Sequence, residues 1–464
     1  MDTPVLAVDL DGTYILGDVT EEAWIELFKS EPLKAILAIF IFLCGGNLAF
    51  KKYLARNVDV SSFFYNHPSE FYDFLRQEKA KGRKIILISA SPQEFVEVFK
   101  GDIFDEAIGS TSTNLKGFRK TKVLKRLYQT FDYVGNTSVD FYVFEAARTP
   151  ILVNARPSLI QKFKDQFPHG IVFSPRPPLV SSVYQLLRIP HWFKNGLLFC
   201  PAILAHEFSI TALANLFFAF VLFGLMSSGN YILNDLFDIH VDRQHSKKKF
   251  RPLASNQISC FFGVALAFLL ILTSMSISFL FSPVLALFLL IYLLIAILYS
   301  RVLKKLEILD IFTLTLLYII RLFAGAFLVS VPITGWFVTF FIFAFLSLAS
   351  VKRASELIIQ GNSIGRKYFE TDIHFLQTFG LASGLLSTLV FLLYLNSEAV
   401  KNLYSSPEFL WMIFPLLVYW YATIWLKVCR GQSLEDPVVF LITSKVNWTL
   451  LLIFSVLFWL SVSL

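Results

Sequence analysis

The sequence predicts an α/β domain built on a parallel sheet, followed by an all-α membrane bundle of nine transmembrane helices. Two patterns indicate this division: short apolar runs alternate with charged stretches before about residue 190, and apolar runs of membrane length recur after it. The composition agrees, because the 464 residues are 55% hydrophobic and only 16% charged, against about 25% charged in a typical soluble chain. With a mean hydropathy of +0.61, this composition excludes a disordered, collagen-like or wholly soluble protein.

The first half has the pattern of strands that are buried on both faces of a sheet. The predicted strands are Val5–Val8, Lys84–Ser89, Tyr133–Gly135 and Ile151–Asn154, and the predicted helices are Ser69–Lys81 and Lys120–Thr130. Nearly continuous apolar strands that alternate with helices predict a parallel sheet covered on both sides. We expect this domain to span residues 1–175, with a proline-bearing linker over 176–191 and the membrane domain over 192–464.

The second half contains apolar runs that predict membrane-spanning helices. They lie at about 193–206, 209–232, 258–281, 283–300, 308–328, 333–350, 374–396, 409–428 and 444–464. A crossing needs about 20 residues, so the first, fourth and sixth runs are short and are expected to be tilted or irregular. One such run is compatible with a soluble core helix, but a succession of nine is not.

Basic residues predict which side of the membrane the loops face. One set of loops carries nearly all of them, for example Lys247–Lys249 and Lys427, whereas the opposite loops carry only Lys401. Basic loops face the cytoplasm, and the short apolar run before Asp9 does not have the form of a signal peptide. We therefore expect a multi-pass protein of the inner or cell membrane, with its N-terminal domain and active-site loops in the cytoplasm and Leu464 on the other side. The net charge of +7 then belongs to these loops, and no nucleic-acid partner is expected.

The stretch Asp9-Leu10-Asp11-Gly12-Thr13 directly follows the first predicted strand. The first carboxylate can act as a nucleophile and the second can reach the leaving oxygen, while Gly12 allows the turn between them. At these residues the chain resembles the haloacid-dehalogenase (HAD) phosphatase superfamily, and the resemblance covers most of residues 1–155. It implies a Rossmann-like fold in which Asp9 and Asp11 are catalytic and bind Mg²⁺.

The same resemblance assigns three further motifs. Ser89, after the second predicted strand, and Lys120 match phosphate-binding positions, with Lys122 as a competitor for the lysine. The fourth motif, usually an acidic Gly-Asp pattern, reads Gly135-Asn136-Thr137-Ser138-Val139-Asp140. The amide of Asn136 is a weaker Mg²⁺ ligand than a carboxylate, and Asp140 could compensate. Two alternatives stay open: an active phosphohydrolase, and a degenerate or regulatory domain.

The segment Leu33–Cys44 is almost wholly apolar after Lys34 and lies where the HAD superfamily carries its cap. It is too short to span a membrane. It is expected either to form a buried cap helix or to rest on the membrane and dock the domain beside the bundle.

The most informative stretch of the second half is Asn234-Asp235-Leu236-Phe237-Asp238-Ile239-His240-Val241-Asp242-Arg243. On one helix Asp235, Asp238 and Asp242 share a face, because offsets of three and four return to the same side. Three carboxylates on one stripe repel each other unless a cation joins them, and Mg²⁺ that bridges to a diphosphate would do so. This motif resembles the UbiA-type intramembrane prenyltransferase superfamily over about residues 190–464. We expect the three aspartates to be catalytic metal ligands, Asn234 to be a further ligand and Arg243 to bind phosphate.

Typical members of that superfamily have a second acidic motif after the sixth span, where this chain reads Lys352-Arg353-Ala354-Ser355-Glu356-Leu357. Two cations in place of carboxylates suit an additional phosphate. With this substitution the chain resembles the branch of the superfamily that contains decaprenyl-phosphate phosphoribosyltransferase. Members of that branch transfer phosphoribose from phosphoribosyl diphosphate (PRPP) to a polyprenyl monophosphate. Other stretches that fit this branch are Trp192-Phe193-Lys194-Asn195, Arg251-Pro252-Leu253-Ala254, Tyr299-Ser300-Arg301-Val302-Leu303-Lys304 and Asp436-Pro437-Val438-Val439.

This resemblance implies Mg²⁺ in both domains, with PRPP, a polyprenyl phosphate lipid and the bilayer as partners. The expected substrate-binding residues of the second half are Lys194, Asn195, Arg243, Lys304, Arg321, Lys352, Arg353 and Glu356. The product would still carry a 5-phosphate, which the first domain could remove to give polyprenyl-phosphoryl ribose. Two alternatives are a prenyltransferase that moves an allylic polyprenyl chain to an aromatic or other acceptor, with a regulatory HAD domain, and a transporter or scaffold without chemistry.

Overall fold

The computed structural model describes residues 4–360, 367–432 and 444–463, and the chain divides into two compact units. One unit, here called the sheet unit, comprises Met1–Leu187 together with Tyr231–Phe268. The other, the helical unit, comprises Arg188–Asn230 together with Leu269–Leu464. The segment 231–268, which contains the predicted acidic motif, therefore packs with the N-terminal domain. Within the sequence-predicted linker 176–191, helix α8 (Leu179–Leu187) belongs to the sheet unit.

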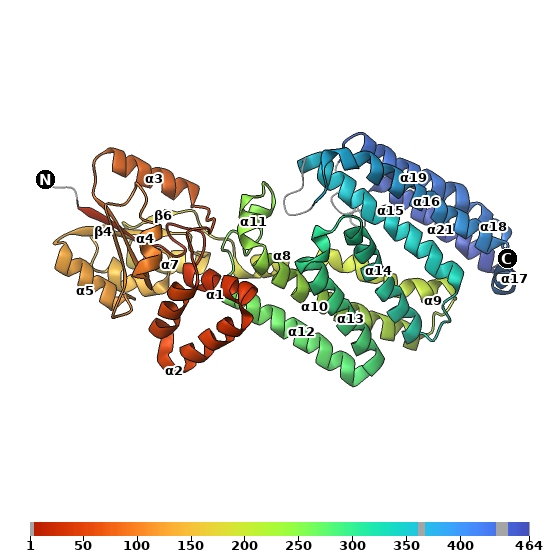
Figure 1. The fold of residues 1–464 in the computed structure, drawn as a ribbon, viewed down its shortest axis with the longest axis horizontal. Helices are drawn as coiled ribbons and strands as arrows, with labels where there is room; N and C mark the ends of the chain where they lie inside the picture. Colours follow the sequence, from red (N-terminus) through yellow and green to blue (C-terminus); the bar gives the residue numbers. More distant parts are fainter. Residues whose placement is uncertain (1–3, 361–366, 433–443, 464) are drawn as a thin grey trace. The chain divides into compact units, whose positions relative to one another are not determined.

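A six-stranded parallel sheet forms the centre of the sheet unit and confirms the predicted α/β class (Figure 1). Its order is β3-β2-β1-β4-β5-β6. The strands are β1 (Val5–Val8), β2 (Ile85–Pro92), β3 (Glu106–Ser110), β4 (Phe131–Gly135), β5 (Pro150–Val153) and β6 (Ile171–Phe173). Strand β1 is central: Leu6 pairs with Ile85 of β2 on one side and with Asp132 of β4 on the other.

The edge strands β3 and β6 were not predicted from the sequence. Strand β3 reads EAIGS, without the continuous apolar run that marks a central strand, and β6 has only three residues. The helices that accompany the sheet are α1 (Val19–Ser30), α2 (Pro32–Asn57), α3 (Ser69–Ala80), α4 (Gln93–Val98), α5 (Phe118–Leu127), η1 (Ser138–Asp140), α6 (Phe141–Phe144) and α7 (Pro157–Gln166). Two of them, α3 and α5, match the predicted helices to within a few residues.

The strand order creates a switch point beside β1. The chain runs outward from β1 through β2 to β3 and then returns to place β4 on the other side of β1. Loops that leave neighbouring strands in opposite directions open a crevice at the carboxyl ends of the strands. Asp9 directly follows β1, and Asn136 directly follows β4.

Helix α2 corrects the prediction for the apolar segment Leu33–Cys44, because it has 26 residues rather than twelve. It is broken at Gly46, whose φ of 74° and ψ of −177° are not helical, so that two arms meet at an angle (Figure 1). One face of the first arm packs on α1: Ala35 and Ala38 are fully buried, and the Trp24 indole donates to the Ala35 carbonyl at 3.1 Å. The opposite face is apolar and exposed, with Phe40 61% accessible.

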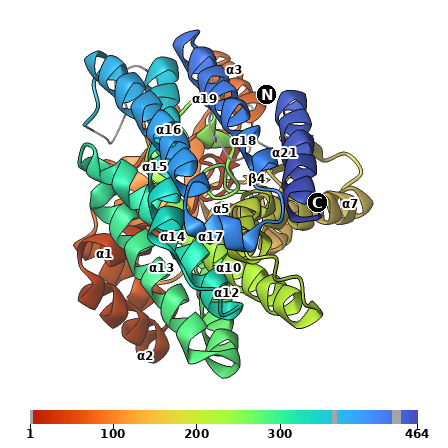
Figure 2. The same cartoon turned by 90° about the vertical axis from the view of Figure 1, so that its right-hand side faces the viewer.

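The helical unit contains long apolar helices, of which α13 to α16 follow one another as packed neighbours (Figure 2). Its elements, with α10 continuing into the sheet unit, are η2 (Ile189–Phe199), α9 (Cys200–Leu204), α10 (Ile210–Phe237), α13 (Pro283–Arg301), η4 (Leu303–Lys305), α14 (Leu309–Leu328), α15 (Gly335–Gln360), η5 (Glu370–Asp372), α16 (Ile373–Leu395), α17 (Glu398–Leu403), α18 (Glu408–Trp411), α19 (Ile413–Cys429) and α21 (Lys445–Ser463). The segment 231–268 adds α11 (Ile239–Gln244), η3 (Lys248–Phe250) and the start of α12 (Cys260–Phe281).

Nine helices in the described part of the chain are long and apolar enough to cross a membrane, which is the number predicted, but their identity differs in one case. The predicted first span, 193–206, instead forms the 3₁₀ helix η2 and the short helix α9, while α2 is the ninth candidate. Prolines 190 and 201 lie in the first turns of η2 and α9 and prevent one continuous α-helix. Gly325 of α14 lets η2 approach closely, since a Cβ there would lie 2.1 Å from the Leu198 carbonyl oxygen.

Candidate functional site

A cavity of about 660 Å³ lies at the carboxyl ends of β1, β2 and β4. The residues of all four predicted phosphatase motifs line it, namely Asp9, Asp11, Ser89, Lys120, Asn136 and Asp140. Parallel strands end at the same edge of a sheet, and this is why motifs far apart in the sequence meet here.

Lys120 and Asp9 form a buried ion pair. The Lys120 ammonium donates to Asp9 Oδ1 at 2.7 Å and to the Tyr133 hydroxyl at 2.9 Å, and the lysine is only 3% exposed. Burial raises the pKa of Asp9 to about 7, and the positive charge of Lys120 opposes that rise. Lys122, the competing candidate, instead lies over the ring of Phe118, 5.5 Å from its centre. The geometry thus places Lys120 beside the proposed nucleophile.

Asp11 is held by hydroxyl groups and one backbone amide. It accepts hydrogen bonds from the Ser91 hydroxyl at 2.7 Å, the Ser89 hydroxyl at 3.1 Å and the Val19 amide at 2.9 Å. Ser91 was not among the predicted site residues. Its spacing from Ser89 was the available signal, because residues two apart in a strand point to the same face.

Asp140 and Asn136 have different roles in the loop after β4. Asp140 accepts from the Tyr133 hydroxyl at 2.8 Å, the Thr137 hydroxyl at 2.7 Å and the backbone amides of Thr137 and Asn136. These bonds occupy both carboxylate oxygens and fix the loop. The Asn136 side-chain oxygen, in contrast, is buried and has no hydrogen-bond partner among the described residues. Asn136 also packs tightly on Gly12, since a Cβ there would lie 2.0 Å from the amide nitrogen.

These donors fit a hard divalent cation. No three His, Cys, Asp or Glu side chains in the described ranges are grouped so as to hold a metal by themselves. At this cavity, however, two carboxylates and an unpartnered amide oxygen line one space, and oxygen atoms of these kinds are the ligands that Mg²⁺ prefers. Asp9, Asp11 and Asn136 are therefore the residues that would hold it.

The acidic motif does not form the one continuous helix that was predicted. Helix α10 ends at Phe237, and Asp238, with φ of −97° and ψ of 10°, separates it from α11. Asp235 and Asp242 are both buried, and one nitrogen of Arg251 donates to both, at 2.9 Å and 2.6 Å. Burial raises the pKa of Asp242 to about 6, and Arg251 opposes the rise. Arg251, which was predicted only as part of a family stretch, thus supplies one cation between two of these carboxylates.

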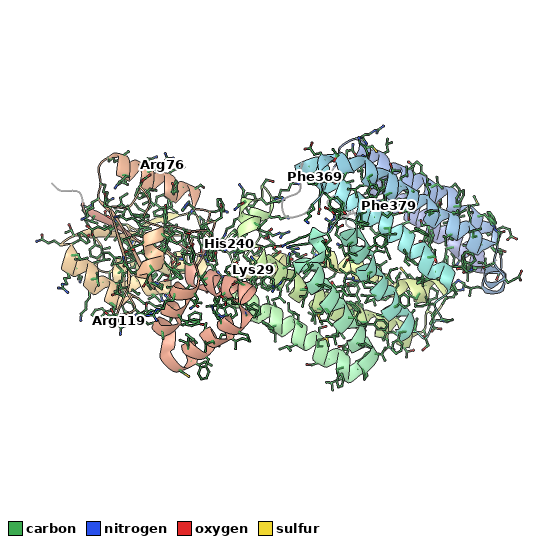
Figure 3. All side chains as sticks on the ribbon, in the orientation of Figure 1. Lys29, Arg76, Arg119, His240, Phe369 and Phe379 are labelled. Carbon is green, nitrogen blue, oxygen red and sulfur yellow. The ribbon has the colours of Figure 1, made fainter. Side chains whose placement is uncertain are left out.

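Arg243 corrects an expectation, because its donors are occupied by contacts within the protein rather than directed to a phosphate. Its two terminal nitrogens donate to both oxygens of Glu22, each at 2.8 Å, and the two side chains are buried. Its remaining donors reach the carbonyls of Ala254, Leu16 and Phe64, which accounts for all five N–H groups. His240 of the same helix (Figure 3) packs on the ring of Phe63, with centroids 4.4 Å apart. These contacts join α11 to the N-terminal part of the sheet unit.

Two predicted residues of the helical unit, Asn195 and Arg321, lie together. The Arg321 Nε donates to Asn195 Oδ1 at 2.8 Å, and the guanidinium lies 4.6 Å from the centre of the Tyr292 ring. Lys194 is 92% buried in the same 3₁₀ helix as Asn195, and Lys304 is half-buried in η4.

Arg353 is the centre of a second buried cluster in the helical unit. Its guanidinium contacts Asp310, Glu356 and the Tyr299 hydroxyl, and Asp310 also accepts from the Tyr368 hydroxyl at 2.7 Å. Asp310 was missed because its partner Arg353 is 43 residues away in the sequence, and periodicity does not reveal such a pair. Lys352 is half-buried in α15. The family stretch Asp436-Pro437-Val438-Val439 lies outside the described residues.

Comparisons with known proteins relate this chain to one family model and to several relatives. Residues 197–451 match the model of the UbiA prenyltransferase family. The protein y4nM of Sinorhizobium fredii, described as uncharacterized, is 31% identical over 458 residues, which cover 96% of this chain and 88% of that one. The nodulation protein NoeC of Azorhizobium caulinodans is 30% identical over 55% of this chain and 85% of its own.

Decaprenyl-phosphate phosphoribosyltransferase of Mycobacterium tuberculosis is 30% identical over 193 residues, which cover 40% of this chain and 64% of that protein. Among solved structures, a UbiA homolog from Aeropyrum pernix is similar over 59% of this chain and 98% of its own, with 16% identity and a TM-score of 0.41. A HAD family hydrolase of Salmonella enterica is similar over 35% of this chain and 65% of its own, with 20% identity and a TM-score of 0.28.

Proposed function

Because this chain belongs to the UbiA prenyltransferase family, we propose that it transfers 5-phosphoribose from PRPP to a polyprenyl phosphate and then removes the 5-phosphate from the lipid-linked product. The observation that carries the proposal is that the acidic motif and the Asp9 cavity belong to one compact unit. An acidic motif for transfer and a cavity for phosphate removal within one unit suit two consecutive steps on one lipid.

The choice of phosphoribose rests on the second motif of the family. Lys352 and Arg353 stand where carboxylates are typical, and a relative named for phosphoribosyl transfer is 30% identical over part of the chain. PRPP brings a diphosphate and a 5-phosphate, and the acceptor lipid brings another phosphate. We assign the neutralisation of these groups to Lys304, Arg321 and Lys352, because Arg353 is already paired with Asp310 and Glu356.

In the transfer step, the bond between the anomeric carbon and the diphosphate breaks, and the lipid phosphate oxygen forms the new bond to that carbon. Mg²⁺ held by Asp235, Asp238 and Asp242 would neutralise the leaving diphosphate. Arg251 keeps Asp235 and Asp242 close together, and its positive charge opposes the rise in the pKa of Asp242. The cations align the two anions so that attack follows departure of the diphosphate.

In the second step, a carboxylate oxygen of Asp9 attacks the phosphorus of the 5-phosphate and displaces the ribose 5-oxygen. Asp11 gives that oxygen a proton and then takes one from the water that hydrolyses the aspartyl phosphate. Lys120 and Ser89 bind the phosphoryl oxygens. Mg²⁺ held by Asp9, Asp11 and Asn136 would neutralise the phosphate. The products are inorganic phosphate and polyprenyl-phosphoryl ribose.

The test uses purified full-length protein in lipid with labelled PRPP, polyprenyl phosphate and Mg²⁺, and compares the parent with Asp9→Asn and Asp235→Asn. We expect labelled lipid from the parent and from Asp9→Asn but not from Asp235→Asn, with the 5-phosphate retained only in Asp9→Asn. Consumption of an allylic diphosphate without labelled lipid would instead show a prenyltransferase. Phosphate loss that persists in Asp9→Asn would refute the assignment of that site.

We also propose that the sheet unit faces the cytoplasm, as the distribution of basic loops predicts. Protease applied from the cytoplasmic side of oriented membrane vesicles should then remove the sheet unit, whereas protease on the opposite side should leave it intact.

A further inference from the structure

The cavity that contains Asp9 has an apolar wall that removal of a phosphate does not require. Besides the motif residues, the cavity is lined by Trp24 of α1, by Ile39, Phe42 and Phe50 of α2, and by Phe261 of α12. These elements all belong to the sheet unit. The same space thus has a charged region and an aromatic region.

The aromatic side chains of this wall contact one another in series. The ring centres of Phe42 and Phe50 are 5.7 Å apart, those of Phe50 and Phe261 are 6.5 Å apart, and those of Phe261 and Trp24 are 5.8 Å apart. In a straight helix the eight-residue separation of Phe42 and Phe50 would place them about 12 Å apart along the axis. The break at Gly46 is therefore what brings both rings to the same cavity.

The wall is partly accessible, which a purely structural cluster would not need. Phe42 is 46% exposed and Phe261 is 39% exposed, whereas Trp24 and Phe50 behind them are buried. A small sugar phosphate would use the charged region and leave the exposed rings uncovered. An isoprenoid chain attached to the substrate would cover them.

We propose that this aromatic wall binds the isoprenoid end of the substrate, so that the Asp9 site selects phosphomonoesters carried on an isoprenoid lipid over soluble sugar phosphates. The inference rests on the proposed function and adds to it how the substrate is recognised. Membership of a family that acts on isoprenoid lipids and the membrane-length helices of the chain make such a lipid the occupant that this wall fits.

A lysine of α2 can bind the phosphodiester group that joins the lipid to the ribose. Lys51 lines the cavity, is half-buried and donates to the Ala90 carbonyl at 2.7 Å. An ammonium group has three donors, so Lys51 can also meet the phosphodiester anion. Lys120 would then meet the phosphate that is removed, and Lys51 would meet the phosphate that stays.

The test compares two substrates that differ only in the chain, nerylphosphoryl ribose 5-phosphate and methylphosphoryl ribose 5-phosphate, on the full-length protein. For the parent we expect kcat/KM for phosphate release to be at least tenfold higher with the neryl compound. In Phe42→Ser the ratio of the two kcat/KM values should fall toward one, through KM. Phe40→Ser is the matched control, because Phe40 is 61% exposed on the same helix arm but does not line the cavity.

A second measurement separates this inference from the proposed function. A neryl phosphate that carries a photoreactive group is crosslinked to full-length Asp9→Asn, and the labelled peptide is identified. Labelling of residues 39–50 or 259–264 supports the wall even if no phosphomonoester is hydrolysed, in which case only the proposed phosphatase step fails. Equal kcat/KM for both substrates, labelling elsewhere, or an equal effect of Phe40→Ser and Phe42→Ser would overturn the inference while leaving phosphate release intact.

Discussion

The sheet unit contains two aspartate pairs, and it holds them in different ways. Asp9 and Asp11 line an open cavity, where a lysine, two serine hydroxyls and a backbone amide each bind one carboxylate. Asp235 and Asp242 are instead bridged by one nitrogen of Arg251, which donates to both carboxylates. The first pair is supported by groups on β2, α1 and α5, whereas the second pair shares one cation. Single substitutions should therefore affect the two pairs unequally.

The largest effect is expected at the contact that joins the two regions. Arg243 follows Asp242 directly, and its partner Glu22 lies on α1, which begins shortly after the Asp11 loop. Arg243→Met leaves Glu22 buried without its cation, so we expect a loss of about 3–5 kcal/mol in stability and a fall of both activities. Thermal unfolding of the protein in detergent measures the change.

The double variant Glu22→Leu/Arg243→Met is the control, because removal of both charges leaves neither one buried alone. It should recover much of the unfolding temperature. An unchanged unfolding temperature in Arg243→Met would mean that the two aspartate pairs are not fastened together by this contact.

Arg251→Met should impair the activity that depends on Asp235 and Asp242 more than the activity that depends on Asp9 and Asp11. It removes the cation shared by Asp235 and Asp242, so we expect phosphoribosyl transfer to fall by roughly 100-fold, which corresponds to about 2.7 kcal/mol. Phosphate release at Asp9 should be retained, because Arg251 does not line that cavity. Arg251→Lys should restore part of the transfer, whereas an equal loss of both activities would mean that Arg251 maintains the unit as a whole.

Asn136→Asp tests whether Asn136 is a ligand of Mg²⁺ bound beside Asp9 and Asp11. A carboxylate is a stronger Mg²⁺ ligand than an amide, so half-maximal phosphate release should need roughly tenfold less Mg²⁺, while transfer keeps its Mg²⁺ requirement. Chelation should abolish both activities, and added Mg²⁺ should restore them. Mg²⁺ titration of each activity measures the shift, and an unchanged titration would remove Asn136 from the ligand set.

Ser91→Ala should have the smallest effect. It removes one of three hydrogen bonds to Asp11, worth about 1 kcal/mol, so kcat for phosphate release should fall roughly fivefold. The remaining bonds from Ser89 and Val19 keep the carboxylate in place. A loss as large as that in Arg251→Met would show that the support of the first pair is not distributed.

The two pairs also differ in how far the sequence predicts them. Asp9 and Asn136 directly follow strands and Ser89 lies in the carboxyl-terminal half of β2, and parallel strands bring such positions together without further information. Arg251 lies in a loop, and the partner of a loop side chain depends on tertiary packing that periodicity does not describe. For the same reason the sequence did not reveal Glu22 as the partner of Arg243, or Asp310 as that of Arg353.

Sequence patterns also failed to predict the irregular elements of the fold. The central strands and eight of the membrane-length helices were predicted, because their apolar patterns are long or continuous. The short edge strand β6 has too few residues for a pattern, and 193–206 reads as one apolar run although its prolines divide it. The length of helix α2 was underestimated because the pair Gly45-Gly46 is typical of a helix end. The helix instead continues beyond this pair in a new direction.

The break at Gly46 has a consequence for the insertion of the nascent chain into the membrane. By length and hydropathy α2 qualifies as a span, and a straight α2 could act as a signal anchor that commits the chain to cross the bilayer. An apolar hairpin with a glycine corner can dip into the bilayer and come back to the side from which it entered. Gly46 would then determine whether α2 crosses the membrane, and therefore the direction in which every later helix crosses it.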